Sequence, residues 1–155
     1  MNTKIQLLKA DLKFDVTQIQ KIYGRLKTTN SSPLDPEQAI VVGYYLHNLY
    51  TAFEHLCTLI AAAFENQIKD HSQWHALLLR RMTQNVEGIR PRFLSDQSHQ
   101  CLDELRRFRH VFRSAYSITL EPDRLELVLK QALQLESLYQ TDLEVFERFL
   151  ASLSS

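Results

Sequence analysis

Apolar residues recur at intervals of three and four along most of the chain, which is the repeat of an amphipathic helix. The first such stripe lies within residues 4–27 and consists of Leu8, Leu12, Val16, Ile19, Tyr23 and Leu26. The segment TTNSSPLDP then interrupts the repeat with small polar residues and two prolines, and it therefore predicts a loop.

A second helix is predicted to begin at Pro36, because proline fits the first helical position and Asp35 before it is a good N-cap. Its main apolar stripe is Val42, Leu46, Leu49, Phe53, Leu56, Ile60 and Phe64. A second stripe lies beside it and comprises Val41, Tyr45, Asn48, Ala52, His55 and Leu59. A helix with two faces available for packing is expected at the centre of a bundle rather than at its edge.

Three further helices are predicted after this one. The short third helix, with Ser72 as its cap, carries Trp74, Leu77, Leu78, Arg81 and Met82 and is expected to stop at Gly88, shortly before Pro91. The fourth begins at Ser95 or Asp96, and its inward stripe is Leu102, Leu105, Phe108, Phe112 and Ala115. The pattern lapses near 117–121, and the last helix begins at Pro122 with the stripe Leu125, Leu129, Ala132, Leu135, Tyr139, Leu143, Phe146 and Leu150.

These stripes predict an all-α fold, an antiparallel bundle of four long helices plus one shorter helix, in a single domain over residues 1–155. The composition agrees, because 3 Gly and 4 Pro leave few chain reversals and 45% hydrophobic residues suffice for one core. No stretch has the form of a signal peptide, and the most apolar run, CTLIAAAF, is too short to cross a bilayer. Cys57 and Cys101 lack CxxC spacing and are expected to be reduced core thiols, so a cytoplasmic protein is expected.

The fourth predicted helix contains the stretch ELRRFRHVFRSAY, which combines an apolar stripe with a dense set of cations. Arg106, His110 and Arg113 form one line along this helix, and Arg109, Arg113 and Tyr116 form a neighbouring line. The 18 basic and 18 acidic residues of the whole chain cancel, so any affinity for nucleic acid has to come from this local pattern. The pattern fits a solvated basic face near a helix C-terminus, and it also fits phosphate recognition by guanidinium groups.

Three stretches together resemble the HepT-like branch of the HEPN superfamily, small all-α proteins that are often the toxin of a toxin–antitoxin pair. They are LDELRRFRHVFRSAY, YYLHNLYTAFEHL and WHALLLRRM, and the resemblance extends over about residues 36–150. The signature of the superfamily is an arginine, about four residues, a histidine, one further residue and a tyrosine. In this chain Arg109 and Tyr116 match the signature, whereas Ser114 stands where the histidine is expected.

The resemblance implies a metal-independent endoribonuclease that needs no cofactor and acts on RNA in a cleft between the two protomers of a homodimer. Such cleavage needs a base for the ribose 2′-hydroxyl, a cation for the phosphorane and an acid for the leaving oxygen, roles that suit histidine and arginine. The resemblance implies that Arg109 binds the scissile phosphate, that Ser114 occupies the position of the base and that Tyr116 lines the site. Arg106, His110 and Arg113 are the predicted further phosphate-binding residues.

The resemblance also implies a protein partner. In related toxin systems a minimal nucleotidyltransferase antitoxin transfers AMP to the tyrosine of the signature. Tyr116 is the matching residue here, and it is therefore the candidate modification target.

Ser114 leaves three interpretations of the activity open, because a serine hydroxyl does not titrate near neutral pH and cannot act as a base without help. The chain is a degenerate, inactive member, or His110, one turn before Ser114, supplies the base. In the third interpretation the serine was introduced on purpose, to disarm a protein that naturally has histidine there. An alternative function from a different class is a non-catalytic helical dimer that binds RNA or a nucleotidyltransferase partner.

Polar residues outside the signature are assigned structural roles. Glu54 and Asn48 in the second predicted helix are expected to form hydrogen bonds at the edge of the core, and His75 is expected to pack around Trp74. No HExxH pattern or equivalent ligand spacing is present, so the sequence predicts no metal site.

Overall fold

The computed structural model of the protein describes residues 3–29, 33–65, 74–114 and 121–153, and for residues 113 and 114 it describes the backbone alone. Within these residues five helices form an all-α bundle without a β-strand, which confirms the predicted fold class. The helices are α1 (Thr3–Thr28), α2 (Pro36–Phe64), α3 (Trp74–Met82), α4 (Asp96–Ser114) and α5 (Pro122–Leu153).

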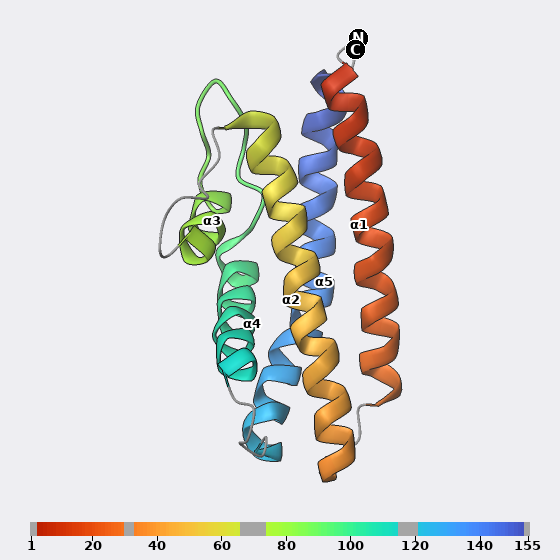
Figure 1. The fold of residues 1–155 in the computed structure, drawn as a ribbon. Helices are drawn as coiled ribbons and strands as arrows, with labels where there is room; N and C mark the ends of the chain where they lie inside the picture. Colours follow the sequence, from red (N-terminus) through yellow and green to blue (C-terminus); the bar gives the residue numbers. More distant parts are fainter. Residues whose placement is uncertain (1–2, 30–32, 66–73, 115–120, 154–155) are drawn as a thin grey trace.

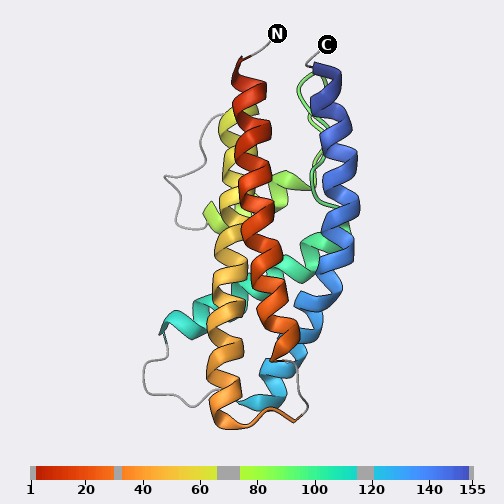
Figure 2. The same cartoon turned by 90° about the vertical axis from the view of Figure 1, so that its right-hand side faces the viewer.

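The three longest helices, α1, α2 and α5, lie side by side, and α1 runs antiparallel to the other two (Figures 1 and 2). The first residues of α1 and the last residues of α5 therefore lie at the same end of the bundle. Helix α4 crosses the bundle obliquely and packs on α2 and α5, as Figure 2 shows. The short helix α3 packs against α2 and α4, on the side of α2 that faces away from α1 (Figure 1).

Helix α2 begins where the sequence predicts and occupies the centre of the fold. Its N-terminus is a capping box, in which Asp35 Oδ1 accepts the Gln38 backbone N–H at 2.8 Å and Gln38 Oε1 accepts the Asp35 N–H at 3.0 Å. The helix packs against α1, α3, α4 and α5, which confirms the central position expected from its two faces.

Buried aromatic rings join α1, α2 and α5. Tyr23 of α1 and Tyr139 of α5 stack with their ring centroids 6.1 Å apart, and Phe53 of α2 meets Tyr139 edge to face at 5.0 Å. The Tyr23 hydroxyl donates to the Ala132 carbonyl at 2.7 Å, so this polar group is satisfied inside the core. Burial of each such side chain stabilises the fold by roughly 1.5–3 kcal/mol.

The structure corrects the predicted end of α3, which lies at Met82 rather than at Gly88. Residues 83–90 form a tight turn instead, in which Val86 and Arg90 exchange backbone hydrogen bonds of 2.8 and 2.9 Å and Gly88 adopts a φ of 79°. The buried Arg90 guanidinium stabilises this turn by donating to the Arg81 and Gln84 carbonyl oxygens at 3.2 and 3.0 Å. The predicted cap of α3, at position 72, lies outside the described residues.

Candidate functional site

Helix α4, which carries the arginines, is anchored at its N-terminus by Asp142 of α5. Asp142 Oδ2 accepts hydrogen bonds from the Ser95 backbone N–H at 3.0 Å and from the Ser98 hydroxyl at 2.5 Å. Farther along α4, Leu102 and Leu105 are fully buried. This anchor and these leucines fix the rotation of α4, and with it the directions in which its arginines point.

Two arginines of α4 pair with carboxylates of the same helix. Arg106 Nε lies 2.8 Å from Asp103 Oδ1, while Arg107 reaches Asp103 Oδ2 at 3.0 Å and Glu104 Oε1 at 3.4 Å. Pairs at these spacings on a helix surface each contribute only a few tenths of a kcal/mol, about 0.2–0.5. Their main consequence is electrostatic, because they neutralise much of the basic face that the sequence predicts.

Arg109, the arginine of the signature, contacts α2 instead. Its Cζ lies 5.7 Å from the centroid of the Tyr50 ring, a distance at which an aromatic face attracts a cation. Its Nε is buried and has no hydrogen-bond partner among the described residues. Burial raises the pKa of Tyr50, and the neighbouring Glu54 carboxylate raises it further, so the phenol stays neutral. Among the described residues, Arg109 forms no ion pair with a carboxylate, in contrast to Arg106 and Arg107.

His75 of α3 extends this set of contacts. The Tyr50 hydroxyl donates to Glu54 Oε2 at 2.9 Å, and His75 Nδ1 is hydrogen-bonded to the same oxygen. The imidazole also packs against Trp74, with the ring centroids 3.9 Å apart, as predicted. Glu54 is buried and hydrogen-bonded, as the sequence predicts.

These contacts bring three helices together at one place. Arg109 comes from α4, Tyr50 and Glu54 from α2, and His75 from α3, and both α3 and α4 pack on the same side of α2 (Figure 1). The sequence contains one signal for this group, because Tyr50 and Glu54 are four residues apart and therefore share a face of α2. Its connection to His75 and Arg109 depends on how the helices pack.

The other residues of the predicted site belong to the last two turns of α4 or lie outside the described residues. His110 is exposed on this helix. Arg113 and Ser114 belong to its last turn, where only the backbone is described, and Tyr116 lies outside the described residues. The structure thus places Arg109, while the roles of these four residues stay predictions.

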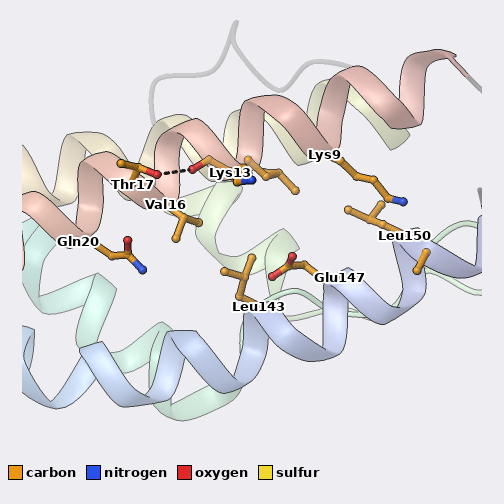
Figure 3. A pocket seen from close by; sticks show the side chains of 10 residues that line it. Lys9, Lys13, Val16, Thr17, Gln20, Leu143, Glu147 and Leu150 are labelled. Carbon is orange, nitrogen blue, oxygen red and sulfur yellow. Dashed lines mark hydrogen bonds between the residues drawn. The ribbon is translucent and has the colours of Figure 1, made fainter.

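A groove between α1 and α5 has different chemistry (Figure 3). It has a volume of about 590 Å³, and aliphatic side chains such as Leu12, Val16 and Leu143 form much of its lining together with Lys13 and Glu147. Among the described residues that line it, histidine, cysteine and arginine are absent. The groove therefore provides neither an imidazole base nor a guanidinium fork, and the contacts around Arg109 form the better candidate site.

The described residues also bear on membrane insertion, metal binding and thiol chemistry. Across the described parts of the chain, no helix is both long and apolar enough to span a bilayer. The same residues include no group of three or more His, Cys, Asp or Glu side chains arranged to hold a metal ion. Cys57 and Cys101 are buried free thiols, and burial raises the pKa of both, that of Cys57 to about 12.

Comparison with known proteins gives one match. No curated protein and no solved structure matches the chain. A family model described as HepT-like protein matches residues 41–150, which include all of α3 and α4, most of α2 and α5, and every residue of the contacts around Arg109. Because this match covers well over half of the chain, the protein belongs to the HepT-like family of the HEPN superfamily.

Proposed function

We propose that the protein is a metal-independent endoribonuclease of the toxin class, in which Arg109 binds the scissile phosphate. The observation that supports this most is the environment of Arg109, which lies over Tyr50 while Arg106 and Arg107 pair with carboxylates. A guanidinium whose charge is not cancelled can bind two phosphate oxygens and stabilise the charge of a phosphorane. Membership of the HepT-like family supports the same class of activity.

Residue 114 determines how active this chain is. The signature has its base there, and general bases accelerate such reactions by roughly 10²–10⁴-fold. Ser114 cannot fill this role unaided. We therefore expect the chain to cleave RNA far more slowly than a variant with the histidine of the signature.

A homodimer is part of this proposal. Residues 109 and 114 are five positions apart, which separates them by about 140° around a regular helix. A site that uses both therefore needs an unwound helix end or two copies of the motif, and the resemblance to the family favours the second. Apolar side chains suitable for a dimer face lie nearby, because Val111 of α4 is 44% exposed and Tyr44 of α2 is 55% exposed. The His47 and Phe112 rings, 5.6 Å apart, join the two helices between these positions.

The test is cleavage of a labelled RNA in the presence of EDTA. The unaltered chain is compared with Ser114→His, and that variant is further combined with Arg109→Ala or, as a matched control, with Arg107→Ala. We expect Ser114→His to cleave, Arg109→Ala to abolish that cleavage and Arg107→Ala to preserve it. A folded Ser114→His variant that leaves RNA intact would contradict the nuclease proposal.

The alternative is a non-catalytic helical dimer that binds RNA or a minimal nucleotidyltransferase, and Ser114 is the observation that favours it. It predicts that Ser114→His leaves RNA intact, whereas joint replacement of Arg109 and Arg113 by alanine abolishes RNA binding.

The proposed nucleotidyltransferase antitoxin has its own test. Incubation with that enzyme and labelled ATP should transfer AMP to the chain, and Tyr116→Phe should prevent the transfer.

A further inference from the structure

We propose that His75 is a catalytic residue of this site, which takes a proton from the substrate and thereby supplies the base that Ser114 does not. The inference rests on the proposed ribonuclease function and identifies a further residue for that reaction. It is carried by the contacts that join the His75 imidazole, the Glu54 carboxylate, the Tyr50 phenol and the Arg109 guanidinium.

Glu54 orients the imidazole for proton transfer. An ionised carboxylate can only accept hydrogen bonds, so the bond from His75 Nδ1 to Glu54 Oε2 requires the proton on Nδ1. Nε2 then carries the lone pair, as in sites where a carboxylate fixes the tautomer of a catalytic histidine. Glu54 itself is only 8% exposed and is fixed further by the Tyr50 hydroxyl, so the acceptor is held in place.

The imidazole is also accessible. The His75 side chain is 34% exposed, although Trp74 packs against its ring. A histidine with one nitrogen on a buried carboxylate and part of its ring at the surface can exchange a proton with a bound ligand.

Arg109 lies at the other end of the same contacts, which links the proposed base to the proposed phosphate site. The guanidinium packs over the Tyr50 ring, and the hydroxyl of that ring reaches the Glu54 oxygen that holds His75. Helices α3 and α4 also contact each other directly. An RNA strand held by Arg109 therefore lies on the surface where α3 presents His75.

The proposed step is an internal transesterification of the RNA backbone. His75 Nε2 takes the proton of a ribose 2′-hydroxyl, and the 2′-oxygen forms a bond to the adjacent phosphorus. The bond from phosphorus to the 5′-oxygen then breaks, and this oxygen takes a proton from water. The resulting hydroxide removes the proton from the His75 imidazolium, so the products are a 2′,3′-cyclic phosphate and a 5′-hydroxyl, and the enzyme is restored.

The experiment measures the slow RNA cleavage of the unaltered chain in EDTA and compares it with His75→Gln, Glu54→Gln and His99→Gln. We expect His75→Gln to lose roughly 10²-fold or more of the rate. Glu54→Gln should lose a smaller part, because it disturbs the positioning of the base. His99→Gln is the matched control, since it removes a histidine of α4 that lies outside the proposed site, and it should retain the rate.

Two readouts separate catalysis from a structural role. Added imidazole should restore cleavage to His75→Ala, because a small base can occupy the vacated space, whereas it cannot repair a misfolded chain. The rate of the unaltered chain should rise with pH as a histidine loses its proton, and this rise should be absent in His75→Gln. The ionisable groups connected to the imidazole in this profile are Glu54 and Tyr50 from α2 and Arg109 from α4.

The outcomes also distinguish this inference from the proposed function. If His75→Gln cleaves as fast as the unaltered chain, or if only Ser114→His cleaves, the role of His75 is overturned while the nuclease proposal stands. If neither the unaltered chain nor a folded Ser114→His variant cleaves, the nuclease proposal itself is wrong, and the inference is wrong with it.

Discussion

Glu65 is the residue whose removal should destabilise the fold most clearly. Its Oε2 lies 2.8 Å from Arg90 Nη2 and its Oε1 lies 3.0 Å from Arg81 Nη1. The side chains of Arg90 and Glu65 are only 0% and 6% exposed. Arg90 donates five hydrogen bonds, two to Glu65 and three to the carbonyl oxygens of Arg81, Gln84 and Pro91, which uses the full donor capacity of a guanidinium.

Glu65→Ala leaves the Arg90 charge buried and takes away the acceptors of two of its N–H groups. Breaking a buried pair by removing one partner costs about 3–5 kcal/mol. That is a large part of the roughly 5–15 kcal/mol that stabilises a typical domain. At about 2–4 °C per kcal/mol for a domain of this size, Tm should fall by roughly 6–20 °C.

The free energy of unfolding is measured by urea denaturation, followed by far-UV circular dichroism. The matched control is Lys27→Ala, which breaks an ion pair of 2.7 Å with Glu136 whose lysine is 56% exposed. Because water screens that pair, its loss should cost no more than about 1 kcal/mol. If the two variants lose the same free energy at unchanged m values, burial does not govern the strength of the Arg90 contacts, and the reasoning is refuted.

Two further predictions follow from the pKa shifts. Burial raises the pKa of the Cys57 thiol to about 12. This thiol should therefore resist a disulfide reagent near neutral pH until urea unfolds the chain. Rapid labelling of the native protein would contradict this prediction. Burial also raises the pKa of Tyr23 and Tyr50 above the ordinary value of about 10. Their contribution to stability is therefore complete below about pH 10 and is lost as the pH rises further, because the unfolded chain releases these protons first. The urea concentration at the unfolding midpoint should therefore decrease once the pH exceeds about 10. If all six tyrosines show tyrosinate absorbance while the chain is still helical, the burial argument is wrong.

The sequence predicts those helix boundaries that depend only on residues close together in the chain. Asp35 and Pro36 suffice to place the start of α2, because a cap acts within one turn. The end of α3 could not be predicted in this way, because Arg90 stabilises the turn after α3 through Glu65, the residue that caps the C-terminus of α2. Contacts between distant segments determine that boundary.

The same distinction applies to the candidate site. Asp103 precedes Arg106 by three positions and Arg107 by four, so sequence spacing alone could have indicated that these two arginines pair with a carboxylate. Arg109 and Arg113 have no acidic residue at either spacing, so the sequence distinguishes these two from Arg106 and Arg107. The placement of Arg109 over Tyr50, and that of His75 beside Glu54, depend on the packing of three helices and could not be read from spacing.

Because α1 begins and α5 finishes at the same end of the bundle, the chain is suited to circular permutation (Figures 1 and 2). In the permuted chain, a short flexible linker would join α5 to α1, and the new termini would lie in the connection between α1 and α2. Every helix would be kept, and α1 would become the last helix of the chain. Such a variant would reveal whether α1, which lies outside the family match, joins the rest of the bundle equally well when it is synthesised last.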